Sequence, residues 1–265
     1  MNVITLHHLA CSGGTILSKA IAAMKGVVLL SEIHPDRHLE NGYDPLVQLT
    51  SGYNLDEGER RKLDECFVRE IEVCAGLAKR RNCQLVIRDH CSRDFVEMDR
   101  HASRLVELLQ PHIVVTPIVT VRDPVDTWIS YRRRGWFNKG DPGELCSRLL
   151  RLVAAFDSAP VYKYEDFIAD TDRLLSNLCE HAGIEFCKDF QARMAEVTHL
   201  TGNSGRSGEL PASRPRQRIY KEEVRAFLAS PQYAEVCERF GYTRLLGDEG
   251  FWSERIGRAV DRFSR

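Results

Sequence analysis

Long apolar runs, a strong net charge and paired cysteines are all missing from this sequence of 265 residues. Because no stretch approaches the roughly 18 apolar residues of a membrane-spanning helix, we expect no integral membrane segment. A net charge of −1 excludes a general attraction to nucleic acid, so any anion binding must be local. The first residues carry neither the basic region nor the cleavage site of a signal peptide, which predicts a cytoplasmic protein.

The nine cysteines include no CxxC pair. An odd number of cysteines in a chain without a secretion signal is typical of reduced thiols, and we expect no metal site. Adjacent His7 and His8 do not alter this expectation, since neighbours on a strand point to opposite faces of the sheet.

The sequence does contain a regular alternation of apolar runs and helical patterns. The apolar runs are rich in Val and Ile and lack polar alternation, so they predict strands buried on both faces of a parallel sheet. They cover Val3–Leu9, Val27–Leu30, Gln84–Arg88, Ile113–Val121 and Pro160–Lys163. The helical patterns cover Thr15–Met24, Glu57–Arg81, Phe95–Leu109, Pro124–Arg133, Pro142–Phe156, Thr171–His181, Lys221–Ala229 and Gln232–Phe240. We therefore predict a three-layer α/β fold whose central parallel sheet of about five strands is flanked by helices.

A glycine turn, Ser12-Gly13-Gly14-Thr15, joins the first predicted strand to the first predicted helix. Glycines allow an oxyanion to approach the backbone closely, and the N-terminus of the helix offers unpaired N–H groups. Taken alone, this turn is also compatible with a tight strand-to-helix connection that binds nothing.

A second stretch, Arg122-Asp123-Pro124 with Ser130 two helical turns later, follows the fourth predicted strand. The forked guanidinium of arginine suits a phosphate group. Taken alone, a structural salt bridge from Arg122 to Asp123 or Asp126 is the better interpretation of this stretch.

Together the two stretches resemble the family of PAPS-dependent sulfotransferases, in particular its bacterial branch, which has a P-loop-like fold (PAPS is 3′-phosphoadenosine-5′-phosphosulfate). Residues 10–17 correspond to the family's P-K-S-G-T-T-x-L loop, and residues 122–130 to its R-[DN]-P-x-D-x-x-x-S motif. Residues 161–184 resemble the family's "Y-E-D-L … L-G-I" segment. The three segments occur in the family's order, and the resemblance covers about residues 3 to 245.

The resemblance implies an enzyme that moves a sulfonate group from PAPS to a hydroxyl or amine of a small-molecule, glycan or lipid acceptor, leaving PAP. It implies that the 5′-phosphosulfate is held by Cys11, Ser12, Gly13, Gly14, Thr15 and Ile16. It also implies that Arg122 and Ser130 hold the 3′-phosphate and that no metal takes part. The run Ser204-Gly205-Arg206 resembles a lid that closes over the nucleotide.

On this basis we predict a single sulfotransferase-like domain over residues 1–265. It comprises an α/β nucleotide-binding core at 1–195, a lid loop at 196–218 and C-terminal helices at 219–265. An apolar stripe in the tail, with Phe251 and Ile256, is typical of a helix that packs on its own domain or on the second subunit of a homodimer, and docking on a membrane surface is the less common alternative.

One position departs from the family pattern, because the loop lysine is replaced by Cys11. Arg88, at the end of the third predicted strand, and Lys19, in the first helix, are the candidates to supply the missing cation. We expect Arg88 to face the sulfonate.

The acceptor hydroxyl must lose a proton, so a general base is needed near the ends of the strands. Arg88-Asp89-His90 resembles the family's K-T-H strand end, whose histidine is the base, and this favours His90. Glu32, at the end of the second predicted strand, is the competing candidate.

Two other classes of function stay open. A P-loop kinase would start with the same strand, loop and helix, but it needs a phosphate-directed lysine that this loop lacks. A non-catalytic nucleotide-binding protein would keep the loop and lose the base.

Overall fold

The computed structural model describes residues 2–36, 45–135, 140–201, 210, 216 and 218–246. The chain divides into two compact units. The first, here called the sheet unit, comprises Met1–Arg122 and Arg151–Ser213; the second, the helical unit, comprises Asp123–Leu150 and Arg214–Arg265. The predicted boundaries of core, lid and C-terminal helices stay a prediction.

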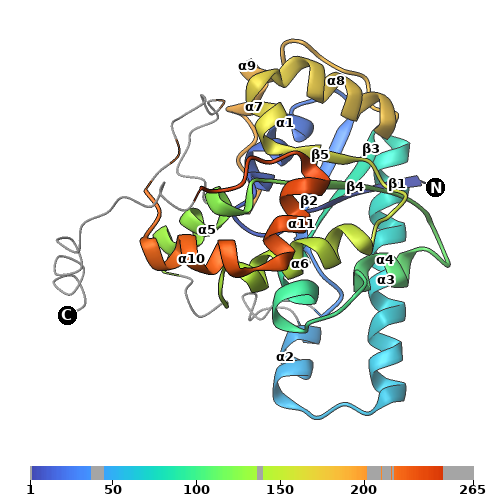
Figure 1. Cartoon of the computed structure of the whole chain (residues 1–265). Helices are drawn as coiled ribbons and strands as arrows, with labels where there is room; N and C mark the ends of the chain where they lie inside the picture. Colours follow the sequence, from blue (N-terminus) through green and yellow to red (C-terminus); the bar gives the residue numbers. More distant parts are fainter. Residues whose placement is uncertain are drawn as a thin grey trace, which may run out of the picture. The chain divides into compact units, whose positions relative to one another are not determined.

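The sheet unit is built on five parallel strands in the order β2-β3-β1-β4-β5 (Figure 1). The strands are β1 Asn2–His7, β2 Val27–Ile33, β3 Gln84–Asp89, β4 Val114–Val121 and β5 Val161–Lys163. The predicted α/β class with a central parallel sheet is confirmed. Strand order reverses at β1, and ligands of such sheets bind outside the carboxyl ends of the strands at such a point.

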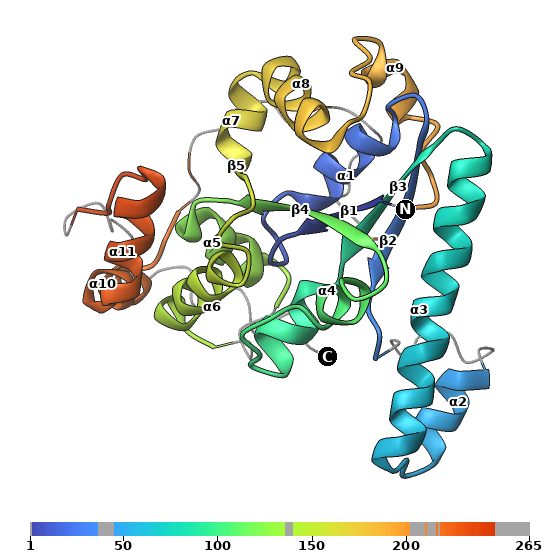
Figure 2. The same ribbon diagram turned by 90° about the vertical axis from the view of Figure 1, so that its right-hand side faces the viewer.

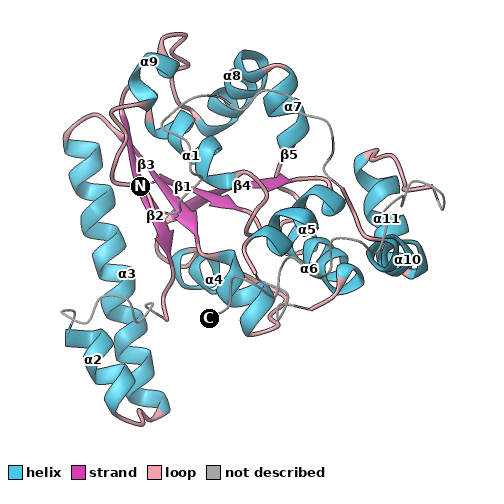
Figure 3. Cartoon of the chain, turned by 90° about the vertical axis from the view of Figure 1, so that its left-hand side faces the viewer, coloured by secondary structure: helices cyan, strands magenta, loops and turns pink. Residues whose placement is uncertain are grey.

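Helices cover both faces of this sheet, which confirms the predicted layers (Figure 2). The helices of the sheet unit are α1 Gly14–Ala22, α2 Pro45–Gly52, α3 Glu57–Arg80, the π-helix η1 Arg93–Glu97, α4 Arg104–Leu109, α7 Tyr164–Ala169, α8 Thr171–Ala182 and α9 Phe190–Met194. Helices α1, α8 and α9 pack on one face, and α3 and α4 pack on the other (Figure 3).

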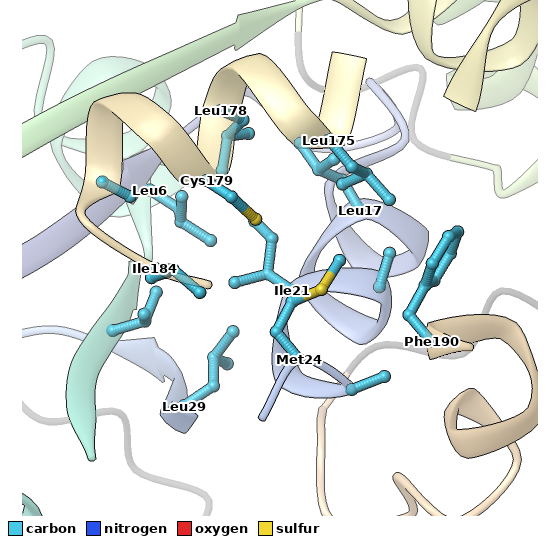
Figure 4. Packing of buried hydrophobic residues seen from close by; sticks show 14 of the residues in the cluster. Leu6, Leu17, Ile21, Met24, Leu29, Leu175, Leu178, Cys179, Ile184 and Phe190 are labelled. Carbon is cyan, nitrogen blue, oxygen red and sulfur yellow. The ribbon is translucent and has the colours of Figure 1, made fainter. Parts of the chain in front are cut away.

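Side chains of β1 alternate between the two faces of the sheet, and both faces are buried. Ile4 and Leu6 belong to the cluster with α1 and α8, whereas Val3 belongs to the cluster with α3 and α4, and Thr5 and His7 are buried polar residues. Burial on both faces explains why the strand is predominantly apolar in the sequence. Figure 4 shows the first cluster, in which Leu17 and Ile21 of α1, together with Met24 shortly after that helix, meet residues of α8. The cluster fixes the position of α1 and hence of the loop before it.

One predicted element is wrong. The pattern Phe95–Leu109 predicts one helix, but the structure has η1 and then α4, separated by residues 98–103. Ser103 caps α4 by accepting a hydrogen bond from the Val106 N–H, and Asp99 has a positive φ of 52°. A serine cap favours the start of a new helix over the continuation of the preceding one. Helices α2, α7 and α9 are absent from the prediction, since they are too short to show a clear period.

The helical unit contains α5 Pro124–Arg133, α10 Lys221–Ala229 and α11 Pro231–Phe240. It also contains most of α6 Pro142–Ala154, because the boundary between the units follows Leu150. Its centre is the carboxylate of Glu223, which accepts a hydrogen bond from Trp128 Nε1 at 2.8 Å and pairs with Arg132. Asp123 and Asp126, the two acids that flank Pro124, pair with Arg216 of the same unit. No described helix is long and apolar enough to cross a membrane.

Leu175 tests whether the α1–α8 cluster holds the sheet unit together. Its side chain is 0% exposed, so Leu175→Ala should lower the free energy of unfolding by about 2–5 kcal/mol. The same truncation at Leu77 of α3, which is 38% exposed, should cost much less. Urea denaturation measures both, and equal losses would contradict the packing described.

Candidate functional site at the strand ends

The turn from β1 to α1 has an unusual backbone conformation. Cys11 and Gly13 have positive φ values of 62° and 90°. Ser12 Oγ donates a hydrogen bond of 2.7 Å to the Leu9 carbonyl, which closes the turn from inside. Among the described residues no side chain caps α1, and its first turn holds no acidic residue. The turn therefore has the form of an anion site at a helix N-terminus.

Two rings explain why the turn needs both glycines. A Cβ on Gly13 would lie 2.2 Å from the ring of Tyr164, and a Cβ on Gly14 would lie 2.0 Å from Nε2 of His8. The two side chains thus occupy the space that larger residues would need. The turn is held between one ring from the end of β5 and one from the end of β1.

Arg88 connects this turn to the neighbouring strand ends. Its side chain is 0% exposed, and its Nη1 lies 3.4 Å from Oγ1 of Thr15 in the first turn of α1. Its Nη2 pairs with Glu32 at 2.9 Å and donates to the carbonyl and hydroxyl of Thr201. Burial lowers the pKa of the guanidinium, and the charge of Glu32 opposes that effect. The structure thus brings together Arg88, Glu32 and Thr15, all predicted site residues.

Glu32 reaches this position through a distorted strand. Its φ is 55°, and the register of β2 against β3 shifts between Leu30 and Ile33. A non-glycine residue in this conformation costs of order 1–3 kcal/mol, and such strain is concentrated at functional sites. The irregularity accompanies a carboxylate that pairs with Arg88 and stays 37% exposed.

Arg122 extends from the end of β4 toward the same turn. Its Nη1 donates a hydrogen bond of 3.0 Å to the Cys11 carbonyl, and its guanidinium lies 4.7 Å from the centre of the Tyr164 ring. Arg122 follows β4 and Arg88 is near the end of β3, and these two strands lie on opposite sides of β1 in the sheet. The two arginines therefore contact the turn region from opposite sides. Ser130 lies in the helical unit, where its hydroxyl donates to the Asp126 carbonyl, so the predicted joint grip on a 3′-phosphate stays a prediction.

Two solved structures resemble this chain in fold over 92% of its length. The sulfotransferase domain from the Synechococcus PCC 7002 olefin synthase is 18% identical, with a TM-score of 0.54 over 92% of this chain and 95% of that domain. The sulfotransferase domain from the curacin biosynthetic pathway is 15% identical, with a TM-score of 0.52 over 92% of this chain and 98% of that domain. The chain has the fold of a sulfotransferase. No protein-family model matches the sequence, and no curated protein does.

Within this sulfotransferase fold, His8 lies directly beside the glycine turn. Its Nδ1 lies 3.0 Å from the Leu9 carbonyl and must donate, since a carbonyl can only accept. Its Nε2 is enclosed and has no hydrogen-bond partner among the described residues. Burial, together with the positive charge of Arg88, lowers the pKa of His8 to about 4. The ring is therefore neutral at physiological pH, with the lone pair on Nε2.

His7 has a different environment from its neighbour. Its Nδ1 lies 2.9 Å from Oδ2 of Asp89 and its Nε2 lies 2.7 Å from the Thr5 hydroxyl. Ligand-type atoms of His7, Asp89 and Cys91 lie within 4.8 Å of one another. Both His7 nitrogens already have partners, however, and burial raises the pKa of the Cys91 thiol well above its usual range. We regard the group as a hydrogen-bonded part of the core, and the absence of a metal stays a prediction.

For the remaining predicted residues, the structure shows no side-chain contact with the glycine turn among the described residues. Lys19 lies in the last turn of α1, at the opposite end from the glycine turn, whereas Arg88 lies beside Thr15 at its start, and the replacement of the loop lysine by either cation stays a prediction. His90 is half-buried after β3, and its backbone N–H donates to the Ile33 carbonyl. The predicted lid residues Ser204, Gly205 and Arg206, and the apolar tail, lie outside the described residues.

Sequence reasoning gave no site role to three residues that the structure places here. Tyr164 belongs to the motif at residues 161–184 and His8 follows the first strand, but neither pattern indicates that the side chain contacts the glycine turn. Thr201 is separated from Arg88 by 113 positions, and nothing in its surroundings distinguishes it. Because these two residues are far apart in the sequence, no local sequence pattern predicts their contact.

The pKa of His8 predicts a pH effect on stability. The unfolded chain takes up a proton near pH 6.5, whereas the folded chain resists it until about pH 4. Stability should therefore fall as the pH drops through this window, by roughly 1–3 kcal/mol from this residue. His8→Gln should remove that part of the loss, as measured by urea denaturation at several pH values. Identical pH profiles for the two proteins would contradict the assignment.

Proposed function

We propose that this protein is a PAPS-dependent sulfotransferase that transfers a sulfonate group to a hydroxyl or amine of an acceptor. The observation that carries the proposal is the ion pair between Arg88 and Glu32 beside Thr15, within the fold of sulfotransferase domains. Sulfonate transfer requires a positive charge beside the donor and a general base beside the acceptor, and Arg88 and Glu32 suit these two tasks.

The glycine turn would hold the 5′-phosphosulfate of the donor. Backbone N–H groups at the start of α1 and the hydroxyl of Thr15 suit its oxygens. Arg88 would supply the positive charge that Cys11 cannot, because its Nη1 already lies beside Thr15. A buried guanidinium stabilises the negative charge that gathers on the bridging oxygen when the sulfur–oxygen bond breaks.

Arg122, Ser130 and the residues Ser204 to Arg206 would hold the rest of the nucleotide. This part of the proposal rests on the motif Arg122-Asp123-Pro124 and its spacing to Ser130. Arg122 would also hold the glycine turn in place, because its hydrogen bond to the Cys11 carbonyl connects this turn to the end of β4.

Glu32 is the better candidate for the general base, although the K-T-H resemblance ranks His90 first. The Glu32 carboxylate contacts the guanidinium of Arg88, which also contacts Thr15 of the glycine turn. The carboxylate remains partly exposed, so an acceptor can reach it. In the reaction the carboxylate takes the hydroxyl proton, the acceptor oxygen bonds to sulfur, and the bond from sulfur to the phosphate oxygen breaks. PAP leaves as the product.

Ligand binding tests the choice of donor. PAP should raise the melting temperature, since a ligand at a hundredfold excess over its Kd adds about 2.7 kcal/mol of stability. ATP with Mg²⁺ should add much less, because the turn lacks the phosphate-directed lysine of a kinase. Stabilisation by ATP with Mg²⁺ and not by PAP would favour the kinase alternative. PAP binding without sulfonated product from any extract, by mass spectrometry, would favour the non-catalytic alternative.

Two matched amide variants separate the candidate bases. Glu32→Gln should lower turnover with PAPS by about 10²–10⁴, the usual contribution of a general base, and leave PAP affinity within a few-fold. His90→Gln should retain most of the turnover. The reverse result, with activity lost only in His90→Gln, would assign the base to His90.

A further inference from the structure

His8, beside the glycine turn, has an enclosed ring nitrogen without a hydrogen-bond partner among the described residues. Its Nδ1 hydrogen is used by the Leu9 carbonyl, which leaves Nε2 as an acceptor for which the described part of the chain supplies no donor. An enclosed polar atom without a partner costs free energy, so its presence requires an explanation.

The position of Nε2 relates it to the anion site. It lies 2.0 Å from where a Cβ of Gly14 would be, and Gly14 is the first residue of α1. Cα–Cβ bonds in a helix tilt toward the N-terminus, so this space lies at the N-terminal end of α1. Thr15 and Arg88 meet at the same end, where the helix dipole favours an anion.

Burial is the main reason why the His8 ring carries no extra proton without ligand. Arg88 from β3 and, to a smaller extent, His7 from β1 also disfavour a proton, whereas the Leu9 carbonyl and Glu32 from β2 favour one. The ring is neutral as a result. A doubly charged anion at the N-terminus of α1 would change this balance, because it attracts a proton to the nearest nitrogen that can hold one.

We propose that His8 takes up a proton when an anion binds at the glycine turn, so that Nε2 becomes a hydrogen-bond donor to an anion oxygen. The proton comes from solvent, and no other bond changes. The imidazolium then supplies a positive charge next to the turn in which the family's lysine is replaced by Cys11. This inference rests on the proposed function, in which the anion is the phosphosulfate.

The inference predicts anion affinity that depends on pH. Since the pKa of His8 would be higher in the complex than the value of about 4 without ligand, affinity gains a contribution at low pH. That contribution is lost as the pH rises through the pKa of the complex. One linked proton changes affinity by up to about tenfold per pH unit in this window.

Inorganic sulfate is the first probe, because it keeps the same charge across about pH 5 to 8, where histidine titrates. Calorimetry should show sulfate binding more tightly as the pH falls, with proton uptake in buffers of different ionisation enthalpy. His8→Gln, which keeps polar donors but cannot titrate there, should show a shallower dependence. His181→Gln, a change on the exposed last turn of α8, should match the unaltered protein.

Nitrogen NMR of the unaltered protein provides a test that does not depend on a variant folding. The His8 imidazole should change from the neutral form to the imidazolium when sulfate or PAP is added at about pH 6.5. A His8 ring that stays neutral with ligand bound, or equal pH slopes in the unaltered and His8→Gln proteins, would overturn the inference.

The two probes separate this inference from the proposed function. Sulfate binding with protonation of His8, but no binding of PAP, would support the role of His8 and reject PAPS as the donor. PAP binding with a neutral His8 would reject the role of His8 and leave the donor assignment standing.

Discussion

The buried guanidinium of Arg88 is the interaction on which the rest of the site depends. It has no exposed surface, so it requires an anion and several acceptors close by. Glu32 provides the charge, and Thr201 and Thr15 provide oxygens. One side chain thus ties together the end of β2, the start of α1 and a residue more than a hundred positions away. The positive φ of Glu32 and the register shift of β2 occur at the residue whose carboxylate pairs with Arg88.

The fold was predictable because its central strands β1 and β3 are buried on both faces. Val3, Ile4 and Leu6 all lie in a core, so the strand is predominantly apolar, and the alternation of such runs with helical patterns predicts a parallel sheet. The split between η1 and α4 was not predictable in the same way. It depends on the Ser103 cap and on the positive φ of Asp99, which the helical spacing of the apolar residues on either side does not reveal.

The parts of the candidate site that consist of residues adjacent in the sequence were predictable. Contacts between residues that are distant in the sequence were harder to predict. The glycine turn and the position of Arg88 at a strand end follow from local patterns. The pairing of Arg88 with Glu32 joins two strands adjacent in the sheet, so topology is required to see it. The role of His8 depends on a missing side chain at Gly14, and a sequence motif does not show which ring fills that space.

The rings of Tyr164 and His8 on either side of the glycine turn have a consequence for binding. Glycine pairs are usually the most pliable part of a loop, and fixing a residue's backbone costs roughly 1–2 kcal/mol of entropy. Here that cost is met when the protein folds, since the rings, the Arg122 contact to Cys11 and the Ser12 hydroxyl all restrict the turn beforehand. The turn is preorganised, so the anion proposed to bind there would meet donors already in place and would lose little affinity to ordering them.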